Sequence, residues 1–241
     1  MTEASNQPGD SQGFILPDAA KLEALAEFAA GAGHEINNPL ATIIGRAQLL
    51  LKDESDSQRR QMLLSIGAQA YRIRDMIGDT MLFARPPVPE LGQVNLLQSV
   101  KQVVAKSEEE MSNSKFAVLI RIDESIVLLA DPAQLSTVIS ELLRNSRQAL
   151  QPKGGEIQIA AEIQQNSVIL EITDQGRGFS ELERQHAFDP FFSGRQAGRG
   201  LGFGLSKCWR IVSQHGGRIE IQSPTGGPTV VRIGWPISQS A

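Results

Sequence analysis

Two groups of residues in this sequence have the types and spacing needed for phosphoryl chemistry. The first is His34 with Glu35, inside a long helical pattern, where the sequence reads GHEINNPL. The second lies in the C-terminal half and consists of Glu141, Asn145, Asp174, Gly176, Gly178, Gly198, Gly200 and Gly202. An imidazole nitrogen can accept a phosphoryl group, and glycine-rich turns expose backbone N–H groups that bind phosphates. One group therefore offers an acceptor and the other a phosphate-binding pocket.

The surroundings of His34 distinguish it from an ordinary polar residue on a helix. A histidine beside a glutamate is usually a solvated pair, but Pro39 follows within the same helical pattern. Proline in a helix interior removes a backbone hydrogen bond and costs about 3 kcal/mol, which a plain coiled-coil stalk has no reason to bear. We expect a kink that exposes His34. Glu35 could then fix one imidazole tautomer or accept its proton, and Asn38, one turn further on, could position a water.

The elements around His34 are predicted to be two antiparallel helices. From Asp18, a candidate N-cap, apolar residues recur every three or four positions as far as Leu50, and again from Met62 to Leu82. A polar stretch separates the two runs, and Pro86 and Pro87 end the second. Each apolar stripe is wider than one partner helix can cover. Two copies of the hairpin in a four-helix bundle would bury both stripes, so we expect a homodimer.

Composition excludes several classes of protein. The chain has 241 residues, 41% of them hydrophobic, which suits one large or two small globular domains. A net charge of −4 argues against a nucleic-acid binder. No run of about 18 apolar residues suggests a membrane span, and the first 17 residues, polar and without periodicity, do not have the layout of a signal peptide. The single cysteine, Cys208, fits a reducing compartment. We expect a flexible N-terminal tail and a cytoplasmic protein.

The C-terminal region is predicted to be α/β. Helices are indicated at about 96–111 and from Pro132, where Asp131 can serve as N-cap, and extended segments at 116–122 and 126–130. Two strands of period 2 follow at 156–163 and 167–173. Glu141 and Asn145 are four residues apart and so share a helix face. Taken alone, that pair would be read as a solvated face.

The glycine segments refine this interpretation. The second strand leads directly into Asp174, Gly176 and Gly178, where a carboxylate could accept a hydrogen bond from an exocyclic amine such as that of adenine. The segment from Gly198 precedes a helix, and free N–H groups at a helix N-terminus favour phosphate. It is neither a Walker loop nor a Rossmann fingerprint, because it lacks Gly-Lys-Ser/Thr and Phe203 stands at the third glycine position. Each segment is a weak signal alone, but their order is specific.

The segment GHEINNPL resembles the H-box of dimeric sensor histidine kinases, in the variant typical of nitrogen-regulator-type kinases. The resemblance implies that His34 accepts phosphate and that Glu35 aids the transfer. It also implies that Asn38 occupies the position used to hydrolyse a partner's phospho-aspartate.

Four further segments resemble the ATP-binding domain shared by histidine kinases, gyrase-type ATPases and heat-shock ATPases: SELLRNSRQAL, DQGRGF, AFDPFFS and GRGLGFGLS. The resemblance covers about residues 18–237. It implies that Asn145 coordinates Mg²⁺ and that Asp174 binds the adenine amine, with Gly176 and Gly178 shaping the base pocket. It also implies that the phosphates are contacted by Gly198, Gly200, Leu201 and Gly202. The hinge and clasp of an ATP lid would be formed by Phe188, Phe191 and Phe192.

Two positions depart from the common histidine kinase pattern. Gln148 stands where many kinases have Lys or Arg, so phosphate charge would be met by Mg²⁺ and by a choice among Arg144, Arg147, Arg199 and Lys207. Glu141 stands where kinases frequently have asparagine and related ATPases have the glutamate that activates water. Glu141 could therefore help the transfer or hydrolyse ATP unproductively.

Together these features predict an α+β protein: a helical hairpin at 18–85 forming a dimeric four-helix bundle, a linker at 86–90, and a GHKL-type α/β sandwich at 91–238 that binds ATP. The resemblance implies an ATP-dependent histidine kinase that passes phosphate from His34 to an aspartate of a response regulator, with possible phosphatase action. Two alternatives stay open. One is a gyrase-like ATPase that uses Glu141, and the other is a dimeric scaffold that binds ATP and sequesters or dephosphorylates a partner.

Overall fold

The structure is a computed structural model that describes residues 19–84, 86–109, 115–192 and 202–237. The chain divides into two compact units, one spanning Pro17–Pro87 and the other containing Val88–Ala241. The residues of each unit contact mainly other residues of the same unit. The predicted fold class is confirmed in its essentials: a helical hairpin followed by a mixed α/β unit.

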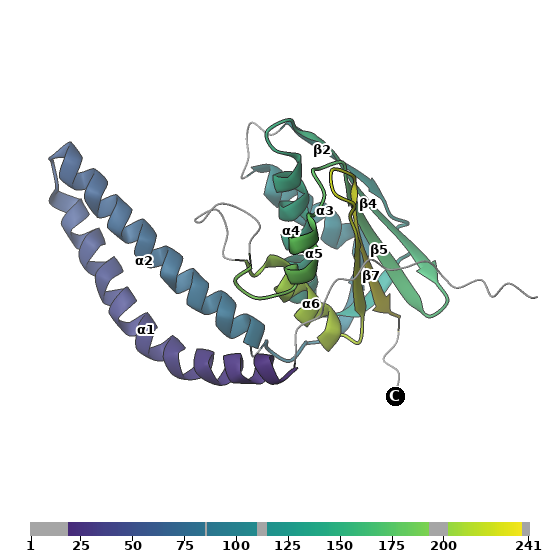
Figure 1. Cartoon of the computed structure of the whole chain (residues 1–241), viewed down its shortest axis with the longest axis horizontal. Helices are drawn as coiled ribbons and strands as arrows, with labels where there is room; N and C mark the ends of the chain where they lie inside the picture. Colours follow the sequence, from purple (N-terminus) through teal and green to yellow (C-terminus); the bar gives the residue numbers. More distant parts are fainter. Residues whose placement is uncertain (1–18, 85, 110–114, 193–201, 238–241) are drawn as a thin grey trace, which may run out of the picture. The chain divides into compact units, whose positions relative to one another are not determined.

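The first unit is a hairpin of two long helices, α1 (Ala19–Asp53) and α2 (Ser57–Ala84), which lie side by side (Figure 1). The turn between them is fixed by Asp56, whose carboxylate accepts the N–H of Arg59 at 2.9 Å and so caps α2. Leu40, Ile44 and Ala70 form the buried contact between the helices. The side chain of Gln48 also donates to the Tyr71 hydroxyl across the hairpin at 2.7 Å.

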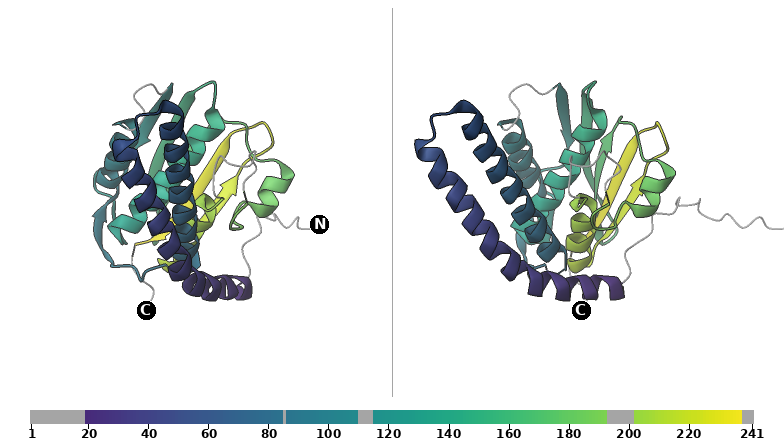
Figure 2. Two further views of the ribbon diagram at one scale, coloured as in Figure 1. Left: turned by 90° about the vertical axis from the view of Figure 1, so that its left-hand side faces the viewer. Right: turned by 60° about the vertical axis from the view of Figure 1, so that its left-hand side comes forward.

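Helix α1 contains Pro39 in its interior and is nevertheless continuous from Ala19 to Asp53. Figure 2 shows that α1 changes direction along its length. Proline cannot donate to the carbonyl one turn earlier, and its ring crowds that carbonyl, so a bend is the usual result. The candidate N-cap Asp18 lies outside the described residues.

The second unit contains a five-stranded sheet in the order β2-β4-β5-β7-β6. Its strands are β2 (Phe116–Arg121), β4 (Gly155–Gln164), β5 (Ser167–Asp174), β6 (Arg218–Gln222) and β7 (Thr229–Pro236). The β2–β4 pair is parallel and the other pairs are antiparallel. A separate antiparallel pair joins β1 (Gly92–Asn95) to β3 (Val127–Ala130).

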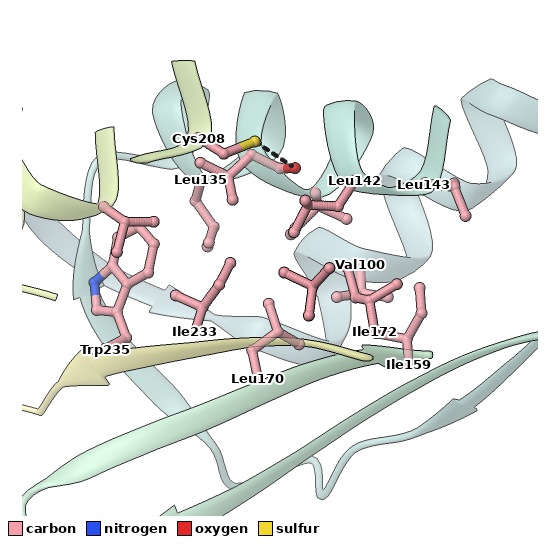
Figure 3. Close-up of a cluster of buried hydrophobic side chains, with 14 of the residues drawn as sticks. Val100, Leu135, Leu142, Leu143, Ile159, Leu170, Ile172, Cys208, Ile233 and Trp235 are labelled. Carbon is pink, nitrogen blue, oxygen red and sulfur yellow. Dashed lines mark hydrogen bonds between the residues drawn. The ribbon is translucent and has the colours of Figure 1, made fainter. Parts of the chain in front are cut away.

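The helices α3 (Leu96–Glu109), α4 (Pro132–Leu150) and α6 (Gly204–Gln214) lie over one face of this sheet (Figure 1). Burial alternates strictly along β5 and β7, because one face of each strand meets the helices. Figure 3 shows the resulting core, in which Leu135 and Leu142 of α4 face Leu170 and Ile233 of the sheet. Cys208 of α6 is fully buried there, and burial raises the pKa of its thiol.

The start of the second unit is fastened to α4 through Asp131. The Asp131 carboxylate accepts the N–H groups of Ala133 and Gln134 as the predicted N-cap, and its other oxygen accepts the N–H of Glu90 at 3.0 Å. Burial works against ionisation, but these three hydrogen bonds hold the pKa of Asp131 below its usual value. His215, at the C-terminal end of α6, accepts the backbone N–H of Asp131 at Nε2, 3.1 Å away. Its Nδ1 lies 2.8 Å from the carbonyl of Ile211 and must carry the proton, because a carbonyl can only accept.

Candidate functional site

Helix α4 presents Glu141, Asn145 and Ser146 from its C-terminal half. Pro132 at the first helical position and Asp131 at the N-cap fix where the helix begins, and its apolar stripe packs on the sheet. Glu141 and Ser146 are buried, and Asn145 is half-buried. The spacing of four residues places Glu141 and Asn145 on one face, as predicted.

Asp174 ends β5 and lies against α4. Its side chain is only 3% exposed, and Oδ1 accepts the backbone N–H of Gly176 at 2.9 Å. Burial raises the pKa of Asp174 above its usual value, and hydrogen bonds from Ser146 and Gly176 oppose that rise only in part. A Cβ at position 176 would lie 2.5 Å from the Cβ of Ala149. Only glycine therefore lets this turn pack so closely on α4.

The start of α6 closes over the same part of α4. A Cβ on Gly204 would lie 3.1 Å from Oε2 of Glu141 and 3.6 Å from Nδ2 of Asn145. One turn into α6, Nζ of Lys207 lies 2.7 Å from Oε1 of Glu141. The structure thus brings the Glu141/Asn145 face, the Asp174 turn and the first residues of α6 to one region of the unit. Of the predicted phosphate contacts, Gly202 is described, whereas Gly198, Gly200 and Leu201 lie outside the described residues.

The phenylalanines of the AFDPFFS segment have different environments. Phe188 is 1% exposed and belongs to the core, whereas Phe191 is 52% exposed and has a positive φ of 65°. The Phe191 ring meets the Phe203 ring edge to face at 4.6 Å between centroids. Gly202 has φ +72°, and a Cβ there would lie 2.5 Å from the backbone of Phe191 and of Phe192. This segment therefore packs directly against the residues that precede α6.

The turn from Gly176 to Ser180 is held by a set of contacts that were not predicted from the sequence. Ser180 and Glu183 form a capping box at the start of α5 (Glu181–His186), and Arg177 makes two hydrogen bonds to the Glu183 carboxylate, at 2.9 and 2.5 Å. Burial alone would raise the pKa of Glu183, but Arg177 and the Ser180 hydrogen bonds lower it to about 2. The Ser-x-x-Glu spacing is a readable signal for this motif. Nothing in the sequence marked Ser146 as the partner of Asp174.

Three of the four candidate cations for phosphate are described, and they differ in burial and in partners. Arg147 is buried, and its guanidinium donates to the carbonyl and the hydroxyl of Ser107 on α3, the first at 3.0 Å. Lys207 and Arg144 both contact Glu141. Of these three only Arg144 has a well-exposed side chain, at 56%. Arg199, the fourth candidate, lies outside the described residues.

Asn145 offers the kind of oxygen ligand that Mg²⁺ takes. Among the described residues, no group of three or more His, Cys, Asp or Glu side chains could hold a metal ion. A magnesium ion here would thus take its remaining ligands from phosphate oxygens and water, which is its usual mode in phosphate-binding sites. The residues present fit such an ion.

In the hairpin, His34, Glu35 and Asn38 are all exposed on α1, whereas Leu40 and Ile44 are buried against α2. Gly33 permits close packing there, since a Cβ at that position would lie 2.5 Å from Sδ of Met81. The candidate acceptor histidine therefore lies next to the tight contact between the helices, with its imidazole open to approach. No helix in the described part of the chain is both long and apolar enough to cross a membrane.

The fold and the site define a protein with two modules. One is a helical hairpin that carries an exposed histidine, and the other is an α/β domain of the nucleotide-binding type. Residues 24–87 match the His Kinase A (phospho-acceptor) domain. Residues 130–239 match the family of histidine kinase-, DNA gyrase B- and HSP90-like ATPases. The chain belongs to the sensor histidine kinases of two-component systems. The nitrogen-regulator-type variant of the H-box stays a prediction.

Relatives support this membership. The chain is 29% identical to sporulation kinase D of Bacillus subtilis (strain 168), over 92% of this chain and 44% of that protein. It is 30% identical to the sensor histidine kinase ZraS of Klebsiella oxytoca, over 90% of this chain and 47% of that protein. The chain thus spans about half the length of these relatives.

Solved structures share the fold. Full-length ShkA in complex with AMPPNP matches with a TM-score of 0.76 at 19% identity, over 89% of this chain and 46% of that one. Histidine kinase ThkA in complex with the response regulator TrrA matches with a TM-score of 0.64 at 24% identity, over 91% of this chain and 64% of that one.

Proposed function

We propose that this chain is an ATP-dependent protein histidine kinase that phosphorylates itself on His34 and passes the phosphoryl group to an aspartate of a response regulator. The observation that carries the proposal is the exposed His34-Glu35 pair on a proline-containing helix, in a chain whose other unit gathers Asn145, Asp174 and the start of α6. In this scheme residues 18–85 serve dimerisation and phosphotransfer, 86–90 are the linker, and 91–238 bind ATP.

The nucleotide is held by groups of complementary chemistry. The buried carboxylate of Asp174 accepts a hydrogen bond from the adenine amine, and the glycines at 176 and 178 leave room for the base. The backbone N–H groups ahead of α6 meet the phosphates, together with Gly198, Gly200, Leu201 and Gly202. Asn145 holds Mg²⁺, which neutralises phosphate charge when bound.

The chemical step is an in-line displacement at the γ-phosphorus. One ring nitrogen of His34 attacks, the bond between the γ-phosphorus and the β,γ-bridging oxygen breaks, and ADP leaves. Glu35 takes the proton from the other ring nitrogen or holds its tautomer. Positioning and charge neutralisation supply most of the rate, as in phosphoryl transfer generally. In a separate, opposing reaction, Asn38 positions a water that hydrolyses the phospho-aspartate of the regulator and releases inorganic phosphate.

The hairpin acts as a dimer. Apolar side chains left exposed on α1 and α2 support this: Ile43, Leu49, Leu50, Met62, Leu64, Ile66 and Ile73. A second copy of the hairpin would cover them in a four-helix bundle. ATP as substrate and a single buried thiol fit a cytoplasmic location.

Incubation with γ-labelled ATP tests the proposal. We expect an acid-labile, base-stable label on the protein that disappears in His34→Gln, while that variant binds nucleotide as tightly as the wild type. Transfer of the label to one member of a panel of receiver domains would identify the partner. Free phosphate without labelled protein would instead favour the ATPase alternative, and bound nucleotide without either product would favour the scaffold.

A further inference from the structure

The carboxylate of Glu141 is held by cations at both oxygens. Nζ of Lys207 lies 2.7 Å from Oε1, and the guanidinium of Arg144 contacts Oε2. The side chains of Glu141 and Lys207 are each 9% exposed, whereas Arg144 is largely open to solvent. The lysine pair is therefore the buried part of this cluster.

The place of Lys207 in the fold calls for an explanation. It lies in the buried row of α6 with Ser206, Cys208, Ile211 and Val212, immediately after the glycine-rich segment. An ammonium group in such a row is costly to desolvate unless a carboxylate meets it. Glu141 is that carboxylate, and it comes from a different helix.

Glu141 is also the residue that could direct ATP toward water. A carboxylate acts as general base only if one of its oxygens reaches the proton to be removed. Here Lys207 takes one acceptor position on Oε1 and Arg144 takes one on Oε2, and the two positive charges hold the carboxylate oriented toward them rather than toward a water. The pairing thus opposes hydrolysis while leaving Asn145, one turn away on α4, in place for the nucleotide.

We propose that Lys207 is a positioning residue that holds Glu141 out of hydrolysis and so keeps the γ-phosphoryl group of ATP for the histidine. The inference rests on the proposed function and deepens it. The suppressed reaction forms a bond between a water oxygen and the γ-phosphorus and breaks the bond to the β,γ-bridging oxygen. ADP leaves, and the proton of the water passes to Glu141.

The test measures ADP release and phosphohistidine in the same reaction, using the full chain. In Lys207→Met, ADP release not matched by phosphohistidine should rise roughly tenfold or more, since a general base typically contributes at least that much. Adding Glu141→Gln to Lys207→Met should return this excess to the wild-type level. Lys207→Arg, which keeps the charge, should resemble the wild type. Lys101→Met, an exposed lysine on α3, is the control for removing a charge.

Two results would overturn the inference. The first is that Lys207→Met binds nucleotide but shows the same excess ADP release as the wild type. The second is that the excess persists in the double variant in which Glu141→Gln is added. If Lys207→Met does not fold, Lys207→Gln takes its place: its amide can keep a neutral hydrogen bond to Oε1 but carries no charge, so the excess ADP release should still rise, by less than the tenfold expected for Lys207→Met. A wild-type chain that binds ATP and forms no phosphohistidine would refute the kinase proposal. The effect of Lys207 on hydrolysis could still be measured from ADP release.

Discussion

Asp174 is a buried carboxylate whose ionisation opposes folding, and we propose that it also accepts a hydrogen bond from the adenine amine. Its pKa is raised by burial, so the folded state binds a proton more tightly than the unfolded chain. The contribution of Asp174 to stability is therefore favourable below its ordinary pKa and is lost as the pH rises through the raised value. At neutral pH the ionised side chain therefore weakens the fold relative to its protonated form.

Replacing Asp174 with Asn should separate these two effects. The amide oxygen can still accept the N–H of Gly176, and the buried charge is gone. We expect the free energy of unfolding at pH 7 to be at least as large as in the wild type, because the cost of burying the ionised carboxylate is gone. Nucleotide affinity should fall at least tenfold, because the amine-accepting carboxylate is lost. Denaturant unfolding and titration with a fluorescent ATP analogue measure the two quantities.

Glu171→Gln is the matched control, because Glu171 lies on the same strand as Asp174 but on the opposite face of the sheet. There its Oε2 lies 2.7 Å from Nε of Arg232. Its nucleotide affinity should equal that of the wild type. An Asp174→Asn protein that is clearly less stable and binds nucleotide normally would show that this carboxylate is structural.

Glu183 carries a pH-dependent part of the stability with the opposite sign. Its pKa is lowered to about 2 from 4.5 by Arg177 and Ser180, so its contribution is present above about pH 4.5 and is lost as the pH falls toward 2. Glu183→Gln should lower the free energy of unfolding at pH 7 by about 2 kcal/mol, a figure reduced from the full shift because the Arg177 side chain is 56% exposed. The difference should shrink between pH 4.5 and 3 in denaturant titrations.

The neighbouring Glu181 provides the control for this measurement. Its side chain is 73% exposed in its pair with Arg184, so Glu181→Gln should leave stability almost unchanged. A loss in Glu183→Gln that is the same at every pH would indicate lost packing rather than lost charge.

At the scale of elements, Gly202 lies two residues before α6 and packs against Phe191 and Phe192 of the AFDPFFS segment. It has a positive φ, and a Cβ would collide with the backbone of Phe191 and Phe192. Gly202→Ala should therefore destabilise the domain by about 2 kcal/mol or more and weaken nucleotide binding. Gly226→Ala is the comparison, because Gly226 has nearly the same φ, +73°, with open space around it. It should lose only about 1 kcal/mol, measured by thermal or denaturant unfolding. Equal losses would mean that backbone strain, and not packing against the phenylalanines, sets the effect.

Elements with strong local signals were predictable. The two hairpin helices, the start of α4 at Asp131-Pro132 and the strands β4 and β5 follow from periodicity and caps, and the structure has all of them. The short strand β1 and the strands β6 and β7 were not predicted. The pairing of β1 with β3, and of β7 between β5 and β6, depends on contacts distant in the chain, which periodicity does not encode.

The site divides in the same way. Spacing predicted that Glu141 and Asn145 share a face, and the order of the glycine segments indicated a nucleotide pocket. The Glu141–Lys207 ion pair and the Ser146–Asp174 hydrogen bond join residues that are far apart in sequence. A single sequence shows the types of such residues but not which of them meet, so it indicated Lys207 only as one of four candidate cations for phosphate and did not indicate its pairing with Glu141.

At the scale of the whole molecule, the proposed homodimer is the feature that can be tested most directly. Ile66 and Ile73 are 49% and 44% exposed on α2. Replacing both with glutamate should convert a wild-type dimer to a monomer, because charges would be desolvated in the bundle. Sedimentation equilibrium measures the mass, and the melting temperature of the wild type should rise with protein concentration.

Ile163→Glu is the control, since Ile163 is 57% exposed at the end of β4 in the other unit. It should leave the mass unchanged. A wild-type chain that sediments as a monomer at all concentrations, or a double variant that remains dimeric, would exclude this face as the interface.

The link from Glu90 to Asp131 has a mechanical consequence. Asp131 is the N-cap of α4, the helix that carries Glu141 and Asn145. Its backbone N–H donates to His215 at the C-terminal end of α6, the helix that carries Lys207. A displacement of the backbone at Glu90 would accordingly act on the N-cap of α4 and, through His215, on the end of α6. The backbone at Glu90 is thus coupled by side-chain hydrogen bonds to the ends of the two helices that carry Glu141, Asn145 and Lys207.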